Sequence, residues 1–195
     1  MIERSWVLLG HRLRSTSIQK TIFLDRDGTI IVDKHYLKDP NQVELVDGSV
    51  NGLVLLQSSG YRLVVVTNQS GVGRGYFSIG DVEKCNQRAS ELLSLAGVWI
   101  DDWLFCPHAP GENCRCRKPL PGLIDQAREI FPVDQQRSFV IGDRDSDVLL
   151  GQVANMRGLL VLTGSGKSYQ KWAQDHGHRY FLDLDGAAKY ILSCE

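Results

Sequence analysis

The sequence predicts a doubly wound α/β domain built on a mainly parallel sheet. Short runs rich in Val, Ile and Leu alternate along the chain with longer segments of helical periodicity. Strands that are apolar on both faces are typical of parallel sheets covered by helices on each side. At 195 residues, with 43% hydrophobic and 23% charged residues, the chain is long enough for one such domain with its own core.

Four segments have the composition of buried strands. They are bounded by polar or glycine-containing stretches and are too short and too rich in β-branched residues to be helices of ordinary length. In chain order they are TIFL (21–24), YRLVVVT (61–67), SFVIG (138–142) and GLLVLT (158–163).

Helical segments lie between and after these strands. One begins near Asp47 and ends at Gly60, which can adopt the left-handed conformation common at helix C-termini. A second begins at Ser78, where Asp81 gives a weak capping-box pattern, and runs toward Gly97. Three more are expected directly after Pro121, around 145–155 and around 168–176.

The ends and the charge of the chain limit its partners. Residues 1–20 show neither periodicity and are interpreted as a mobile N-terminal extension or a misassigned start, which leaves 21–195 as a single domain. No run reaches the roughly 18 apolar residues of a membrane span, and charges interrupt the apolar WVLLG near the start, so we expect a cytoplasmic protein. With 22 basic and 23 acidic residues the net charge is -1, which argues against nucleic-acid and membrane partners.

Polar residues stand where three of the expected strands end. The first strand leads into DRDGT (25–29), the second ends in TNQSG (67–71) and the third leads into DRDSD (143–147). Such residues also populate ordinary turns. Because the carboxyl ends of parallel strands meet at one edge of a sheet, where ligands bind, the three stretches together indicate a site.

Two other motif interpretations fail on spacing. A calcium loop beginning at Asp25 requires Gly at its sixth position, which is Ile30. The GSGKS segment at 164–168 resembles the end of a phosphate-binding P-loop, but the first required glycine would fall at Val161.

The two carboxylates of the first stretch suit phosphoryl transfer. Gly28 permits the chain to turn, so that one of the two carboxylates, Asp25 or Asp27, can be a nucleophile while the other reaches the leaving group. Clustered carboxylates need a cation, and an all-oxygen ligand set favours Mg²⁺. A metal, an in-line nucleophile and a cationic side chain are the components that phosphoryl transfer requires.

The stretch CPHAPGENCRCRKP (106–119) predicts a second metal site. The chain has five cysteines, an odd number, and no export signal, so structural disulfides are not expected. Three of the cysteines and one histidine lie within this stretch and point to metal binding, at Cys106, His108, Cys114 and Cys116.

Taken in order, FLDRDGT, VVVTNQS, RKP and IGDRDSD resemble the four motifs of the haloacid-dehalogenase-like (HAD) phosphohydrolases, over residues 21–165. With the cysteine stretch and TNQSGVGRGYF, the chain is similar to a zinc-containing branch of that family, which acts on heptose bisphosphates and histidinol phosphate. The resemblance implies a Rossmann-like core with catalytic Mg²⁺ and a small loop clipped by structural Zn²⁺, with no open position for water. The stretches between motifs are too short for a large cap domain.

The resemblance also implies roles for the acidic residues. Asp25 would attack phosphorus and form an aspartyl-phosphate, and Asp27 would protonate the leaving alkoxide and then activate water. Mg²⁺ would be held by the Asp25 side chain, the Asp27 main-chain carbonyl and Asp143. Asp147 would hold the motif lysine or a metal-bound water.

Further roles concern phosphate and substrate. Thr67 and the backbone around Asn68 would bind phosphoryl oxygens, and Lys118 would offset their charge. Arg117 and Arg144 are candidates for a second phosphate or sugar hydroxyls, with a surface arginine as the alternative. The polar segment 32–40 is expected to form a flap. The catalytic set is then Asp25, Asp27, Thr67 and Lys118, and the expected substrate contacts are Asp33, His35, Tyr36, Thr67, Asn68, Gln69, Ser70, Arg117, Lys118 and Arg144.

Similarity at two places favours a heptose substrate. GVGRGYF (71–77) and VLTGSGK (161–167) resemble the heptose enzymes, so the expected reaction removes the C7 phosphate of D-glycero-D-manno-heptose 1,7-bisphosphate. Histidinol phosphate or another small sugar phosphate is the alternative substrate. A zinc-bearing nucleic-acid module is a more remote alternative, because no basic face or aromatic stacking series accompanies the cluster. We expect a monomer whose partner is a small phosphorylated sugar.

Overall fold

The computed structural model describes residues 17–194, and the expectation of a mobile segment at 1–16 lies outside the described residues. The last residues of the expected extension contact the domain. The backbone N–H of Gln19 donates to the carbonyl of Pro132 (3.3 Å), and its carbonyl accepts from the N–H of Asp134 (3.0 Å). The folded part of the chain therefore includes residues before Thr21.

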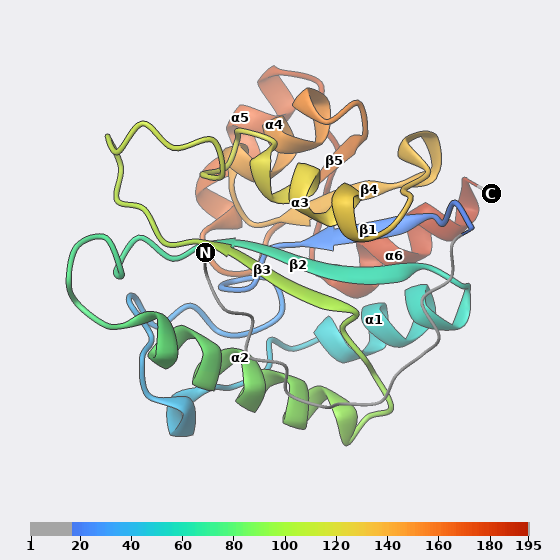
Figure 1. The fold of residues 1–195 in the computed structure, drawn as a ribbon. Coiled ribbons are helices and arrows are strands. Elements are labelled where there is room, and N and C mark those ends of the chain that lie inside the picture. The colour runs from blue at the N-terminus through green and yellow to red at the C-terminus, as the bar shows by residue number, and fades with distance from the viewer. Residues whose placement is uncertain (1–16, 195) are drawn as a thin grey trace.

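The described residues form the predicted parallel sheet, with strand order β3-β2-β1-β4-β5-β6 (Figure 1). Every pairing in it is parallel. The order reverses between the central strands β1 and β4, which places a crevice at their carboxyl ends. The strands are β1 Thr21–Leu24, β2 Arg62–Asn68, β3 Asp102–Cys106, β4 Phe139–Gly142, β5 Arg157–Val161 and β6 Tyr180–Phe181.

Six helices of residues 17–194 cover the sheet, three on each face. Figure 1 shows helices on both sides of the sheet. One face packs against α1, α2 and α6, and the other against α3, α4 and α5. The helices are α1 Ser49–Ser58, α2 Ile79–Ser94, α3 Gly122–Ile130, α4 Asp145–Val153, α5 Gly166–Asp175 and α6 Leu184–Ser193, with short 3-10 turns at Pro40–Gln42 and Gln135–Arg137.

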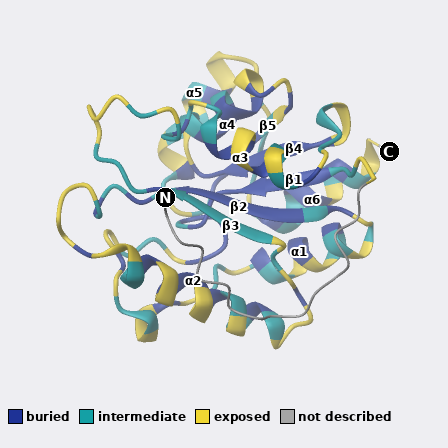
Figure 2. Ribbon diagram, in the orientation of Figure 1, coloured by how far each residue is buried: buried dark blue, intermediate teal, exposed yellow. Residues whose placement is uncertain are grey.

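Strand β1 is apolar throughout because both of its faces are buried. Ile22 and Leu24 pack into the core beneath α1 and α6, whereas Phe23 points to the opposite face and packs with α3. All three residues are fully buried, and Figure 2 draws β1 in the colour of buried residues. Burying each stabilises the fold by about 1.5–3 kcal/mol. The strand that carries the first catalytic motif is therefore held from both sides.

Three elements were not predicted. β3 is an edge strand whose side chains are only partly buried before Cys106, so it lacks the continuous apolar run used to find the others. β6 is only two residues long. α6 did carry a signal, because Asp183 caps the N–H of Gly186 (2.8 Å) and apolar residues recur behind it at helical spacing.

Two local signals were read correctly. The hydroxyl of Ser78 accepts the N–H of Asp81 (3.2 Å), and the Asp81 carboxylate accepts the N–H of Ser78 (2.9 Å), which completes the capping box of α2. Gly60 adopts φ 82°, in the left-handed region. Among residues 17–194, no helix combines the length and apolarity that crossing a bilayer would require.

Candidate active site

The expected catalytic residues converge at the carboxyl edge of the sheet. Asp25 follows β1 and Asp143 follows the adjacent β4, while Thr67 lies near the end of β2 on the other side of β1. Lys118 reaches the same place from the loop before α3. All four are buried, with exposed fractions of 7% or less. Parallel strand order thus assembles residues that lie far apart in the chain.

Gly28 is required for more than a turn. Its φ of 79° is in the left-handed region, as expected for the turn after Asp27. A Cβ atom at this position would also lie 2.3 Å from Oδ2 of Asp143. The glycine therefore lets the first motif approach the carboxylate of the fourth.

Three buried carboxylates form a site suited to a divalent cation. Oxygens of Asp25, Asp143 and Asp147 lie within 4.8 Å of one another. Burial, with the charge of Asp25 added, raises the pKa of Asp143 to about 8. Its Oδ2 accepts the N–H of Ser165 (2.7 Å), while its buried Oδ1 lacks a hydrogen bond from the described residues. An all-oxygen set with an unpaired buried atom fits Mg²⁺.

Lys118 neutralises part of this charge. Its Nζ lies 2.8 Å from Oδ1 of Asp25 and 2.7 Å from Oδ1 of Asp147. Burial opposes the charge of the ammonium, but the two carboxylates outweigh it and raise the pKa of Lys118. Burial raises the pKa of Asp147 to about 6 even with Lys118 beside it. The structure thus places Asp147 against the lysine, the first of its two expected roles.

Asn68 holds the main chain of Lys118. Its Oδ1 accepts the N–H of Lys118 (3.0 Å) and its Nδ2 donates to the carbonyl of Lys118 (3.4 Å). The side chain of Asn68 is therefore engaged with the protein. The expected contact between phosphate and the backbone around Asn68 stays a prediction.

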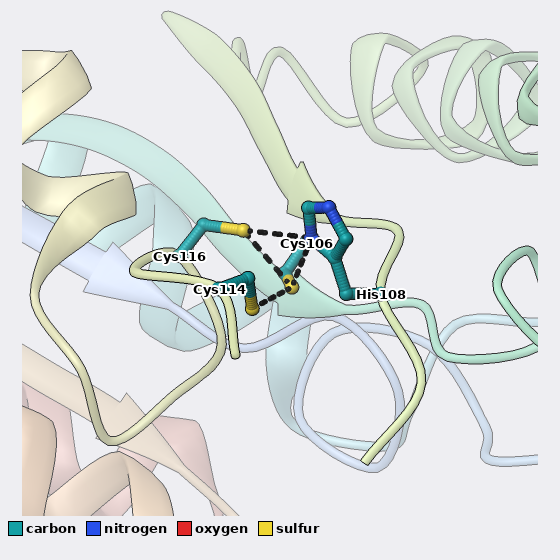
Figure 3. Close-up of side chains that lie close together, drawn as sticks. All are labelled: Cys106, His108, Cys114 and Cys116. Carbon is teal, nitrogen blue, oxygen red and sulfur yellow. Dashed lines mark hydrogen bonds between the residues drawn. The ribbon is translucent and has the colours of Figure 1, made fainter. Parts of the chain in front are cut away.

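The cysteine stretch forms a compact cluster in which four side chains point toward one another (Figure 3). Sγ of Cys106 lies 3.7 Å from Sγ of Cys114 and 3.1 Å from Sγ of Cys116, and Nδ1 of His108 lies 3.2 Å from Sγ of Cys116. Burial raises the pKa of Cys106 and of Cys116. A bound cation would favour the thiolates, so this cluster can hold a metal.

The loop that carries the cysteine cluster packs directly on the loop after β2. The N–H of Gly73 donates to the carbonyl of Pro107, and the N–H of Gln69 donates to the carbonyl of Cys106, both at 2.8 Å. A Cβ atom on Gly73 would lie 2.5 Å from the backbone nitrogen of Ala109. The cluster is therefore joined to the loop that follows Thr67.

A cavity of about 310 Å³ opens beside Asp25. It holds every expected substrate contact and both aspartates of the first motif. Its lining is Asp25, Arg26, Asp27, Asp33, His35, Tyr36, Leu37, Thr67, Asn68, Gln69, Ser70, Gly71, Phe77, Arg117, Lys118, Arg144 and Ser146.

The flap closes one side of this cavity. His35 and Tyr36 both adopt positive φ (47° and 60°), which is rare for residues with side chains. The ring of Tyr36 packs edge-on against Tyr76 with centroids 4.8 Å apart. Nη2 of Arg144 lies 3.6 Å from Oδ2 of Asp33, so the flap pairs with the loop after β4. Tyr76 was not among the predicted residues.

Arg26 is the main residue that the sequence interpretation missed. Its guanidinium is 1% exposed and donates to both carboxylate oxygens of Asp27 at 3.1 Å. Gln69 donates to the same carboxylate at 2.7 Å and to Oγ1 of Thr67 at 3.0 Å. The only available signal was a charged residue between two aspartates at the end of an apolar strand.

The fold and the site together define a haloacid-dehalogenase-like phosphatase, an enzyme that hydrolyses phosphomonoesters. The defining features are a parallel α/β core, paired aspartates after β1, a hydroxyl at the end of β2, a buried lysine and an aspartate after β4. A family model described as HAD-hydrolase-like matches residues 115–187.

Similar proteins and a similar crystal structure show which members of this family the chain resembles. The chain is 40% identical over 167 residues to the D-glycero-beta-D-manno-heptose-1,7-bisphosphate 7-phosphatase of Helicobacter pylori, covering 85% of this chain and 96% of that protein. It is 41% identical over 154 residues to the enzyme of the same name from Pasteurella multocida, covering 75% and 84%. The crystal structure of the D,D-heptose 1,7-bisphosphate phosphatase from B. bronchiseptica, complexed with magnesium and phosphate, superposes with a TM-score of 0.81 and 31% identity, covering 90% and 99%. The chain belongs to the family of HAD-like phosphatases that contains these enzymes.

Proposed function

We propose that this protein removes the C7 phosphate of D-glycero-D-manno-heptose 1,7-bisphosphate through an aspartyl-phosphate on Asp25. The relatives named for this reaction, matched over most of their length, support the substrate. The single observation that carries the chemistry is the buried Asp25 carboxylate, held by Lys118 at the floor of a cavity large enough for a sugar phosphate.

Asp25 is oriented for attack on phosphorus. Its Oδ1 accepts the N–H of Arg26 (2.8 Å) and lies 2.8 Å from Nζ of Lys118, so the carboxylate cannot rotate freely. Lys118 and the hydroxyl of Thr67 would bind the oxygens of the transferring group. Asp27 would protonate the leaving alkoxide and then accept a proton from the attacking water.

The buried carboxylates support a magnesium site. The Asp25 side chain, the Asp27 main-chain carbonyl and Asp143 would hold the ion, while Asp147 keeps Lys118 in place. When bound, Mg²⁺ offsets the negative charge of the phosphoryl oxygens and of the carboxylates around them. The phosphatases of this family use Mg²⁺, and the related crystal structure was obtained with magnesium and phosphate.

The metal at the cysteine cluster is proposed to be structural zinc. Three sulfur ligands and one imidazole nitrogen suit a tetrahedral zinc site, and a Zn–S distance of about 2.3 Å puts thiolates of one site about 3.8 Å apart. The 3.7 Å between the sulfur atoms of Cys106 and Cys114 agrees with this spacing, whereas the 3.1 Å between those of Cys106 and Cys116 is shorter, so these two would move apart when a metal binds. Elemental analysis of the purified protein is expected to find about one zinc per chain.

Substrate choice is proposed to rest on the rim of the cavity. Arg117, whose Nη1 donates to the carbonyl of His108 (3.5 Å), and Arg144 place two guanidinium groups near the phosphate site. They suit a second phosphate or sugar hydroxyls. Asp33, His35, Tyr36 and Ser70 would contact the sugar from the flap and from the loop after β2.

The test is a comparison of kcat/KM for the two anomers of heptose 1,7-bisphosphate, histidinol phosphate and fructose 1,6-bisphosphate. We expect a heptose bisphosphate to lead by about tenfold or more, since a missing polar contact in a built site is costly. A preference for histidinol phosphate would overturn the substrate. Asp25→Asn is expected to abolish turnover in a folded protein, and substantial residual activity in that variant would overturn the mechanism. The monomeric state stays a prediction for size-exclusion chromatography.

A further inference from the structure

Arg26 is the most unusual buried residue outside the roles described so far. Among the described residues, it is the largest by volume of those whose side chains are fully buried. Burying a guanidinium is unfavourable unless its N–H groups find acceptors and its charge finds a partner. A residue in such a position next to two reacting aspartates calls for a specific role.

The hydrogen bonds of its guanidinium form two sets, a fork to the carboxylate of Asp27 and an anchor to Asn86 and Gln69. Nε and Nη2 donate to the two oxygens of Asp27, each at 3.1 Å, in a bidentate pair. On the other side, Nη1 donates to Oδ1 of Asn86 on α2 (2.9 Å), and Nη2 also donates to Oε1 of Gln69 (3.0 Å). The anchor fixes the plane of the guanidinium, and the fork transmits that orientation to Asp27.

Gln69 completes the support. Its Nε2 donates to Oδ2 of Asp27 (2.7 Å) and to Oγ1 of Thr67 (3.0 Å). The Asp27 side chain is 21% exposed, and the residue lines the cavity. The carboxyl group is therefore held from behind by two side chains while part of it remains open to the cavity.

We propose that Arg26 is a positioning residue that holds the Asp27 carboxyl in place for proton transfer at the leaving-group oxygen. The inference rests on the proposed function, in which Asp25 accepts the phosphoryl group. Oδ2 of Asp27 accepts from both Arg26 and Gln69, so the proton would be carried by Oδ1, which accepts only from Nη2 of Arg26 among the described residues. As the Asp25 O–P bond forms and the P–O bond to the sugar breaks, this proton passes to the departing oxygen, which leaves a free alcohol and an ionised Asp27 carboxylate beside Arg26. A misplacement of about 1 Å in such a step can cost about 10²-fold in rate.

The dependence on leaving group separates this role from a structural one. A sugar alkoxide is a strong base and needs the proton of Asp27, whereas p-nitrophenolate leaves without one. Misplacing Asp27 must therefore slow sugar phosphates more than p-nitrophenyl phosphate, while a general loss of structure slows both. The comparison uses kcat/KM, which covers only the steps up to phosphoryl transfer and excludes the later activation of water.

The experiment compares wild type with Arg26→Lys, which keeps the charge and loses the fork. We expect kcat/KM to fall about 10²-fold on a sugar phosphate and about threefold on p-nitrophenyl phosphate. Arg62→Lys is the control, because Arg62 is a partly buried arginine that does not line the cavity and stacks over the ring of Phe131 at 4.0 Å. It is expected to leave the ratio between the two substrates unchanged.

Equal losses on both substrates, or no loss on either, would overturn the proposal. If Arg26→Lys does not fold, Asn86→Ala removes the anchor while Arg26 stays, and a selective loss of about tenfold on the sugar phosphate is expected. Equal losses in that variant count against the proposal in the same way. Asp25→Asn distinguishes a failure of the proposed function from a failure of the role of Arg26. Activity in Asp25→Asn refutes the proposed function. If Asp25→Asn is inactive and Arg26→Lys leaves the ratio of kcat/KM between the two substrates unchanged, only the role of Arg26 is refuted.

Discussion

The side-chain amide of Asn68 brackets the main chain of Lys118, accepting from its N–H at 3.0 Å and donating to its carbonyl at 3.4 Å. The two residues are fifty positions apart, at the end of β2 and in the loop that leaves the cysteine cluster. This pair of hydrogen bonds joins the lysine to the sheet edge. The side chain of Lys118 can then reach Asp25 and Asp147 at once.

Removal of this bracket is expected to impair turnover more than folding. In Asn68→Ala both hydrogen bonds to the main chain of Lys118 are lost, so the Lys118 ammonium is no longer held beside the Asp25 carboxylate. We therefore expect kcat to fall by about 10–100-fold. Steady-state kinetics on a sugar phosphate and a thermal melt measure the two effects. Asn41→Ala is the control, because Asn41 is exposed and its side chain donates to Asp39, within the same short turn. A loss of less than about threefold in Asn68→Ala would show that the bracket does not position the lysine.

Lys118→Met is expected to lower both activity and stability. The substitution leaves two buried carboxylates without their cation, and breaking a buried ion pair costs about 3–5 kcal/mol. Denaturant unfolding of the metal-free variant measures this cost. Lys171→Met removes an exposed lysine from a pair with Asp175 and should change stability by less than about 1 kcal/mol. Equal stability of the two variants would contradict the buried pairing.

Stability of the metal-free protein should fall as pH rises. Burial raises the pKa of Asp143 to about 8, whereas in the unfolded chain it is about 3.9. Between these values the folded protein holds a proton that the unfolded chain has released, so each increase in pH favours unfolding. Mg²⁺ binds the ionised carboxylate and displaces the proton, so its affinity should grow by up to about tenfold per pH unit in the same window.

Thermal melts with and without Mg²⁺ at about pH 6 and about pH 8 check this coupling. The increase in Tm on adding Mg²⁺ should be larger at the higher pH. Asp143→Asn removes the group whose pKa is about 8 and should make the remaining increase less sensitive to pH than in the wild type. A magnesium-induced shift of the same size at both pH values in the wild type would be inconsistent with a proton held at Asp143.

Loss of the cysteine cluster is expected to reach the active site. Cys116 directly precedes Arg117 and Lys118, so Cys116→Ser should release zinc, loosen the loop and lower kcat by about tenfold or more. Zinc content and kinetics are measured on the same preparation. Cys194→Ser is the matched control, since Cys194 is exposed and lies outside the cluster. Full zinc and full activity in Cys116→Ser would separate the cluster from catalysis.

Most of the fold was predictable because the chain carries strong local signals. The inner strands are buried on both faces and therefore appear as unbroken apolar runs, of which TIFL at 21–24 is an example. β3 escaped because an edge strand is half buried and mixes polar with apolar residues. The bounds of α1 and α2 followed from Gly60 and from the Ser78 capping box.

The sequence by itself determined which residue types stand after each strand, and hence the class of chemistry and the two candidate metal clusters. The tertiary structure alone decided which side chains line the cavity and which hold other side chains in place. Asn68 and Gln69 lie beside Thr67 in the chain, yet the amide of one holds Lys118 and the amide of the other holds Asp27. Arg26 acquires its proposed role only because Asn86, sixty residues away, fixes it from α2. Motif spacing reports local backbone direction, whereas hydrogen-bond partners across a sheet edge depend on how the strands and helices pack.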